Sequence, residues 1–352
     1  MKDILITNDK IDIQKDYIAI HFGKERKVLS TGPWNGGITR NLKTVFNLGA
    51  IKKDGQIIAY GDTYKEHMMA VSSKLIGIDP KYSTGLLTGA DMCNYACASM
   101  NYEDIKVGVL VTGGIEKNGG RIGEDTYWNE NDGVWYPTEK IDENAKLEPG
   151  TINIFLFIDA NLTDGAMERA LVTCSEAKTV AIQELAIGSC YSTGLATGSG
   201  TDGTIIVSNP SSTRILTEAG KHCKLGELIG KTVVPAVKEA LYRQTGVDAK
   251  MQHDALRRLK RFGITKELIW QTYRESDYQT FCKEIEDWSK SQDALLWSIM
   301  QAHLLDQWSW GLISKKERVA AENRLLASYT NNKFLESISS IIKKIDFSFI
   351  TD

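Results

Sequence analysis

Glycine and proline are divided unevenly along this 352-residue chain, and that division constrains the fold more than any single motif. Residues 1–247 hold all six prolines and 28 of the 30 glycines, whereas residues 248–352 hold only Gly263 and Gly311. Both residue types mark turns between elements. We therefore predict a turn-rich domain over residues 1–247 and an all-α extension over residues 248–352.

The first region mixes strand and helix patterns. Apolar runs bounded by glycine and polar residues predict strands at residues 17–22, 27–30, 56–60, 106–112, 151–158 and 204–208. Helical patterns occur at residues 64–76, 163–185 and 225–243. This mixed order predicts an α/β or α+β layered domain.

The C-terminal region shows apolar residues three and four positions apart in residues 254–262, 291–305 and 315–328. We expect five or six short helices there. The region also carries five of the eight tryptophans, and tryptophans at helical spacing are more often core residues than part of a cofactor site. Its role is left open between a dimerisation element, which would make the protein a homo-oligomer, and a lid over the site.

Composition excludes several classes of protein. The formal charge of −3 gives no basic surface for nucleic acid. The apolar runs are about five residues long, far below the ~20 that cross a bilayer. The N-terminus does not resemble a secretory signal, and six cysteines are too few for a disulfide scaffold in a chain of this length. We expect a cytoplasmic protein with free thiols, no membrane contact and no nucleic-acid partner.

Metal chemistry by the protein itself is not expected. The five histidines show no metal-ligand spacing, and Cys93 and Cys97 have no second cysteine pair. Cys174 lies among small apolar residues and is predicted to be a core residue.

The predicted helix at residues 163–185 carries a lysine in an unusual place. At about 100° per residue, Lys178 falls among alanines on the apolar face. Such a lysine is either a desolvated base or the partner of a carboxylate, although a lysine that extends its stem across the edge of the face is equally compatible. Glu176 falls on the opposite face, where a solvated carboxylate is the ordinary outcome.

Three glycine-rich loops adjoin predicted strands and are candidates for a site. They lie at residues 30–37, 107–121 and 195–203. The last is not a standard phosphate-binding loop, because no Lys-Ser/Thr follows its glycines and a strand comes next. Turn formation alone would also explain each loop.

Three runs, taken together, resemble the adenosylcobinamide amidohydrolase (CbiZ-type) family. They are Gly150-Thr151-Ile152-Asn153-Ile154, Ser175-Glu176-Ala177-Lys178-Thr179 and Ala196-Thr197-Gly198-Ser199-Gly200-Thr201-Asp202. The segments around Asn118, Arg121 and Trp34-Asn35 are also similar, so the resemblance covers about residues 15–245. It implies hydrolysis of the amide that joins aminopropanol to adenosylcobinamide, giving adenosylcobyric acid for corrinoid salvage. The substrate brings its own cobalt, so the resemblance implies no cofactor of the protein's own.

A fainter resemblance to self-processing β-aminopeptidases and ornithine acetyltransferases implies stacked mixed sheets flanked by helices. In that fold a Ser or Thr after a glycine is the nucleophile, and cleavage before it frees an amine that acts as base. Thr151 occupies the matching place. An intact chain leaves two other possibilities, with Lys178 as base or Thr151 as an ordinary strand residue.

The resemblances suggest roles for individual residues. Thr151 or a water is the nucleophile, Lys178 is a base or an electrostatic partner held by Asp202, and Asn118 is an oxyanion donor. Glu176 is kept as a further catalytic candidate. Because a corrin is broad and flat with amides on its rim, we expect an open groove lined by aromatic and amide groups. The substrate-binding candidates are Trp34, Asn35, Arg121, Thr197, Ser199 and Thr201.

Two other functions remain open at this point. One is a self-processing aminopeptidase or acyltransferase that acts on small amino compounds. The other is a corrinoid-binding sensor or carrier without catalysis, whose tryptophan-rich tail recruits a partner.

Overall fold

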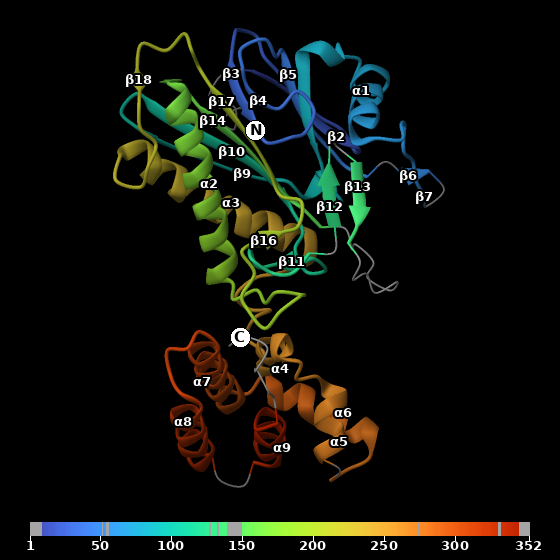
Figure 1. The fold of residues 1–352 in the computed structure, drawn as a ribbon, viewed down its shortest axis with the longest axis vertical. Coiled ribbons are helices and arrows are strands. Elements are labelled where there is room, and N and C mark those ends of the chain that lie inside the picture. The colour runs from blue at the N-terminus through green and yellow to red at the C-terminus, as the bar shows by residue number, and fades with distance from the viewer. Residues whose placement is uncertain are drawn as a thin grey trace. The chain divides into compact units, whose positions relative to one another are not determined.

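The computed structural model describes residues 9–50, 52–53, 56–126, 128–131, 134–138, 150–273, 275–329 and 332–344. The chain divides into two compact units. The first unit comprises Met1–Cys190 and Ala196–Asp248, and the second comprises Tyr191–Leu195 and Ala249–Asp352. Figure 1 shows the elements of each unit.

Two sheets form the centre of the first unit. The four-stranded sheet has the order β1 (Lys10–Ile13), β2 (Tyr17–His21), β5 (Thr44–Leu48), β8 (Ser83–Leu87). The six-stranded sheet has the order β4 (Gly37–Thr39), β3 (Lys27–Ser30), β17 (Gly203–Ser208), β14 (Ile152–Ile158), β10 (Ile105–Gly113), β9 (Ala96–Tyr102). Both sheets are mixed, because β5 pairs with β8 and β14 pairs with β17 in parallel while the other neighbours are antiparallel.

The two sheets pack face to face over one apolar core. Alternate residues of each strand point into it, and its buried members include Ile18, Ile20, Val45, Leu86, Val28, Leu110, Phe155, Phe157, Ile205 and Val207. Strand β14 is buried along its whole length, as expected for a central strand with layers on both of its faces.

Helices cover the outer faces of both sheets. Helix α1 (Tyr64–Lys74) places Met68 and Val71 against Phe46 and Leu48 of the four-stranded sheet. Helices α2 (Asp164–Glu184) and α3 (Lys224–Thr245) contact each other and the six-stranded sheet. Figure 1 shows α1 on one side of the sheets and α2 and α3 on the other. The first unit is therefore an α+β sandwich of stacked mixed sheets flanked by helices, and the predicted fold class is confirmed.

Short elements complete the first unit. They are β6 (Lys52–Lys53), β7 (Gln56–Ile57), η1 (Pro80–Tyr82), η2 (Met92–Asn94), β11 (Gly119–Gly120), β12 (Trp128–Asn131), β13 (Val134–Pro137), β15 (Asn161–Leu162), β16 (Gly198–Ser199) and β18 (Ile215–Leu216). Strands β12 and β13 form a hairpin with exposed apolar side chains, and Trp135 is 66% exposed.

The described part of the second unit is helical, as its sequence predicts. Its elements are α4 (Ala255–Leu259), η3 (Lys260–Phe262), α5 (Lys266–Tyr273), α6 (Tyr278–Ser289), α7 (Gln292–Ser309), α8 (Lys315–Ala327) and α9 (Lys333–Ile342). Trp297 is fully buried, and Trp270, Trp288 and Trp308 pack against the same apolar core. These four tryptophans are structural, in line with the interpretation of their helical spacing.

Candidate active site

Strand pairing brings together segments that lie far apart in the sequence. Asn153 of β14 is the register partner of Gly203 of β17, and the two strands run in parallel. The residues just before each strand, Gly150-Thr151 and Thr201-Asp202, therefore meet at one edge of the sheet. Strand β11 pairs with β16, which adds Asn118 and Ser199 to the same place.

Asp202 joins these segments through its carboxylate. Oδ1 accepts hydrogen bonds from the Ile152 backbone N–H, at 2.9 Å, and from the Ser199 hydroxyl. Oδ2 accepts from the Ser199 backbone N–H, at 3.0 Å, and from Lys178 Nζ, with which Asp202 also forms an ion pair. The two side chains are 15% and 13% exposed. Lys178 is thus the partner of a carboxylate, one of the three alternatives that its sequence position left open.

Gly198 is required for this ion pair. A Cβ at this position would lie 2.4 Å from Asp202 Oδ2 and 2.7 Å from Lys178 Nζ. Both distances are shorter than van der Waals contact allows, so any side chain there would push the pair apart. The glycine acts by close approach, not by an unusual backbone angle.

Two hydroxyl groups and one carbonyl form a directed chain at the start of β14. Thr151 is 5% exposed, and its Oγ1 lies 2.6 Å from Thr201 Oγ1. Thr201 Oγ1 donates to the Gly150 carbonyl at 3.2 Å. A hydroxyl has one hydrogen, so Thr151 must be the donor to Thr201. The lone pairs of Thr151 Oγ1 are then not used in this chain.

The Gly150 carbonyl oxygen receives a second donor, the side-chain amide Nδ2 of Asn118. Asn118 is 6% exposed, and its Oδ1 is buried without a hydrogen-bond partner. A Cβ on Gly150 would lie 2.1 Å from that Oδ1, so only glycine fits beside Asn118. A carbonyl with two donors, next to a threonine hydroxyl, is the geometry that acyl transfer uses to stabilise an oxyanion.

The remaining predicted residues are placed differently. Thr197 accepts a hydrogen bond from the Ile122 N–H at 3.0 Å, and its own N–H donates to Gly120 at 2.8 Å, so it fixes the loop that holds the half-buried Arg121. Glu176 is exposed. It lies about 200° around the helix from Lys178, and no described contact ties it to the cluster.

One expectation is wrong. Trp34 is 3% exposed and packs against Phe46, with ring centroids 6.1 Å apart, in the core beneath α1. It cannot line an open groove as a substrate-binding residue, because its indole is part of that core. The amide of Asn35 donates to the carbonyls of Pro80, at 2.9 Å, and Ser83, at 2.8 Å, so both of its hydrogens hold a loop.

A polar chain near the site was not predicted. Asn153 Nδ2 donates to Asn47 Oδ1 at 2.8 Å, and Asn47 Nδ2 donates to Thr112 Oγ1 at 2.7 Å, so the chain links the two sheets. Asn153 is 1% exposed, and its Oδ1 has no hydrogen-bond partner. The sequence signal that could have predicted this chain is the presence of polar residues, such as Asn153, within otherwise apolar strands.

Cysteine chemistry is disfavoured at the site. Cys174 lies one helical turn before Lys178 and is fully buried, and desolvation raises its pKa to about 12 although the lysine charge opposes this. At neutral pH it is a thiol and a core residue, as predicted.

Among the described residues, no three His, Cys, Asp or Glu side chains lie where they could hold a metal ion.

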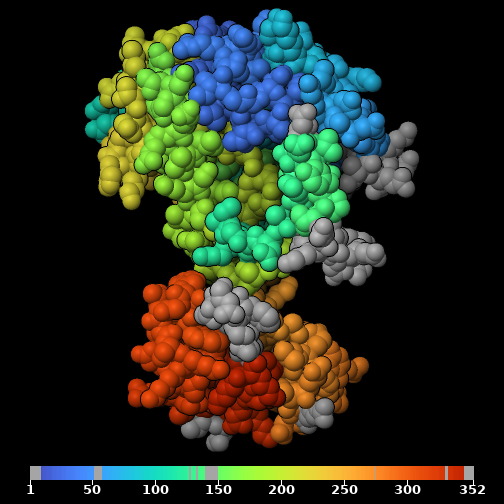
Figure 2. Space-filling view, viewed as in Figure 1, coloured from blue at the N-terminus to red at the C-terminus, as the bar shows by residue number. Residues whose placement is uncertain are grey.

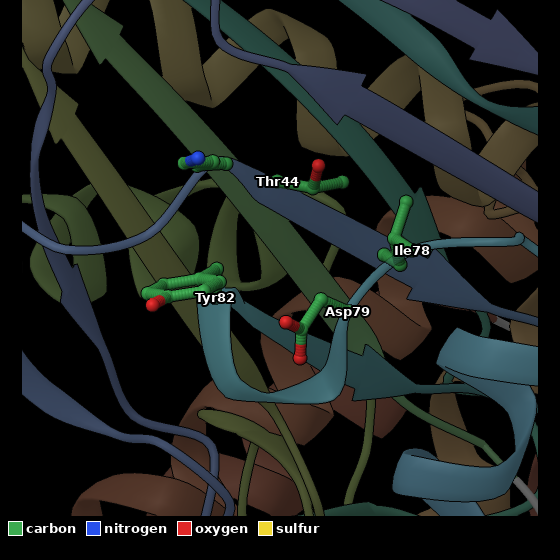
Figure 3. A pocket seen from close by; sticks show the side chains of 5 residues that line it. Thr44, Ile78, Asp79 and Tyr82 are labelled. Atoms are coloured by element: carbon green, nitrogen blue, oxygen red, sulfur yellow. The ribbon is translucent and has the colours of Figure 1, made fainter.

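A cavity of about 330 Å³ lies elsewhere in the first unit, lined by Lys43, Thr44, Ile78, Asp79 and Tyr82. Figure 3 shows these side chains between the start of β5 and the turn η1. None of them belongs to the cluster described above. No helix in the described residues is long and apolar enough to cross a membrane.

The first unit is thus a two-sheet α+β protein in which hydroxyl, amide, lysine and carboxylate groups gather at one sheet edge. A family model for adenosylcobinamide amidohydrolase (CbiZ) matches residues 2–249. The chain belongs to this family, and the resemblance drawn from its motifs is confirmed. The match covers nearly all of the first unit and ends where the helical region begins.

Two further similarities complete the comparison. The uncharacterized protein MJ1613 of Methanocaldococcus jannaschii is 38% identical over 232 residues, which are 64% of this chain and 86% of that protein. The crystal structure of the PH0078 protein from Pyrococcus horikoshii OT3 covers 66% of this chain and 78% of its own, with 13% identity and a TM-score of 0.29. That superposition is too loose to show a shared fold.

Proposed function

We propose that the protein hydrolyses the amide that joins aminopropanol to the corrin ring side chain of adenosylcobinamide, giving adenosylcobyric acid for corrinoid salvage. One observation carries the proposal beyond family membership. The Thr151 hydroxyl lies beside a carbonyl oxygen that receives hydrogen bonds from both Asn118 and Thr201. Amide hydrolysis needs an attacking oxygen and a stabilised oxyanion at one place.

The carbonyl that accepts hydrogen bonds from Asn118 and Thr201 is the protein's own, at the Gly150-Thr151 peptide bond. We propose that this bond is cleaved first. Thr151 Oγ1 attacks the Gly150 carbonyl carbon, the C–N bond breaks, and the hydroxyl proton passes to the nitrogen that becomes the Thr151 α-amine. Water then hydrolyses the resulting ester. This step frees the two donors for a substrate carbonyl and gives the hydroxyl its own base.

The same groups then act on the substrate. Thr151 Oγ1 attacks the amide carbon while its proton moves to the α-amine, and Asn118 and Thr201 stabilise the oxyanion. The α-ammonium returns the proton to the leaving nitrogen as aminopropanol departs. Water, activated by the same amine, hydrolyses the acyl-threonine to the free corrinoid acid. The cobalt stays within the substrate, so the reaction needs no cofactor of the protein's own.

Lys178 and Asp202 act electrostatically in this proposal. An ammonium that donates to a carboxylate has no lone pair to accept a proton, so we assign no base role to Lys178. Its charge balances Asp202, which in turn holds the Ile152 N–H next to Thr151. The pair fixes the position of the nucleophile, and small displacements of a nucleophile can cost about 10² in rate.

Intact-mass measurement tests the nucleophile directly. We expect two chains, of 150 and 202 residues, that stay associated in the native protein. Thr151→Ala should give one uncut, inactive chain, whereas Thr151→Ser, the matched control with a hydroxyl, should be cut and keep part of the activity. A fully active wild-type protein with a single uncut chain would refute the threonine mechanism and favour direct attack by water.

A further inference from the structure

A short segment of the candidate site's loop belongs to the helical unit. Cys190 and Ala196 lie in the first unit, but the five residues between them, Tyr191–Leu195, lie in the second. The chain therefore leaves the first unit after α2, passes through the second, and returns just before β16. This path gives the helical unit a covalent connection to the site that is separate from the one at residue 248.

Arg261 of η3 holds this segment inside the second unit. Its Nη1 donates to the backbone carbonyl of Thr193. The same guanidinium forms a two-pronged pair with Asp306 of α7, at 2.7 Å from Nη1 to Oδ1 and 2.6 Å from Nη2 to Oδ2. The side chains are 8% and 11% exposed. A buried bidentate pair fixes the plane of the guanidinium. Asp306 therefore orients the second N–H of Arg261 Nη1 toward the Thr193 carbonyl.

Both ends of the segment are tied to β11. The Cys190 N–H donates to the Gly119 carbonyl at 2.7 Å, and the Thr197 N–H donates to the Gly120 carbonyl at 2.8 Å. Strand β11 directly follows Asn118 and pairs with β16, whose Ser199 binds Asp202. The two ends of the segment are therefore hydrogen-bonded to the strand that directly follows Asn118, the proposed oxyanion donor.

We propose that the helical unit positions the candidate active site, and that Arg261, held by Asp306, is the positioning residue. The pair fixes Tyr191–Leu195, and the segment fixes the register of β11 and β16. This gives the region outside the family match a role in the reaction. The kinetic part of the inference rests on the proposed function, whereas the structural part does not.

Hydrogen exchange in the full-length protein tests the structural part without a substrate. In Asp306→Asn, which keeps the shape but removes the charge, we expect the amides of Cys190, Ala196 and Thr197 to exchange at least about tenfold faster. Peptides from β14 should be unchanged. The matched control is Glu322→Gln, which weakens another buried arginine–carboxylate pair of the same unit, Arg318–Glu322, and should leave the exchange of residues 190–199 unchanged.

Kinetics separate positioning from stability. We expect Asp306→Asn to lower kcat about tenfold or more, with KM within about twofold of the wild type. Arg261→Lys keeps the charge but loses the planar guanidinium, so its kcat should lie between those of Asp306→Asn and the wild type.

Unchanged exchange at residues 190–199 in folded Asp306→Asn would overturn the inference. Equal acceleration in Glu322→Gln would also overturn it, because the effect would then be general loosening. If the wild type lacks hydrolase activity but the exchange pattern holds, the proposed function fails and the positioning of the loop stands.

Discussion

At the scale of single residues, the site depends on which group donates each hydrogen. Thr201 can donate only once, and it donates to the Gly150 carbonyl, so the hydroxyl of Thr151 donates and its lone pairs stay available. Asp202 accepts four hydrogen bonds from three residues. A carboxylate bound in this way is acceptor-only and is better suited to holding its neighbours than to transferring protons.

Asn118→Ala tests the oxyanion donor. The substitution removes Nδ2 and leaves the Gly150 backbone in place, so we expect kcat for adenosylcobinamide to fall by about 10² to 10³ with little change in the thermal midpoint. Steady-state kinetics and a melting curve measure the two effects. A near-normal rate would contradict the assignment of Asn118 to the oxyanion.

Lys178→Met tests the ion pair at similar side-chain volume. Asp202 keeps three of its four donors, so we expect a folded protein whose kcat falls by about 10² because the start of β14 is displaced. Lys238→Met is the matched control, since Lys238 pairs with the exposed Glu184 at the C-terminal end of α2, outside the cluster, and it should keep full activity. Equal losses in both variants would show an effect of helix stability instead.

At this scale the sequence was informative where motifs carry the chemistry. The runs around Thr151, Lys178 and Asp202 predicted the residues that the structure joins. Pairing of Lys178 with Asp202 was one of the predicted roles, but the sequence could not decide between it and a free base, because the carboxylate comes from a loop 24 residues away. Trp34 was misplaced for a related reason. The glycine-rich loop around Trp34 suggested that its side chain lies at the surface. The indole is instead buried by the packing of α1 over the four-stranded sheet, which no local sequence pattern reveals.

At the scale of elements, one parallel strand pair creates the site. Because β14 and β17 start at the same edge, the loops before them meet there, and the β11–β16 pair adds Asn118, the proposed oxyanion donor. The central strands and the three helices of the first unit were predictable, because their apolar periodicity is strong. Strands β1, β4, β5, β8 and β9 were not predicted from the sequence, and the strand predicted at residues 56–60 is only the two-residue β7. The strand order was not predicted either, since pairing depends on contacts between distant residues.

The paired strands β12 and β13 expose an aromatic ring, Trp135, of the kind that stacks on a flat ring system such as that of the proposed substrate. They follow the β11 loop in sequence, present Trp135 at 66% exposure, and lie on the face of the first unit seen in Figure 2. We expect Trp135→Ala to raise KM for adenosylcobinamide about fivefold, which corresponds to about 1 kcal/mol of ring stacking, with kcat unchanged. Tyr242→Ala on α3, 51% exposed, is the control. An unchanged KM in Trp135→Ala would exclude the hairpin from substrate contact.

At the scale of the whole molecule, the two compositions correspond to two folds. The family match ends at residue 249, close to the predicted boundary, and the glycine-poor remainder forms the helices that its periodicity predicts. The sequence could not show that Tyr191–Leu195 packs with these helices, because a contact between Arg261 and Thr193 leaves no local pattern.

The most direct test of the central claim is to incubate the purified full-length protein with adenosylcobinamide and a chelator, and to look for adenosylcobyric acid by mass spectrometry. We predict that the wild type forms the product despite the chelator and that Thr151→Ala does not. Tight corrinoid binding by the wild type without any product would contradict the account and would favour a corrinoid sensor or carrier.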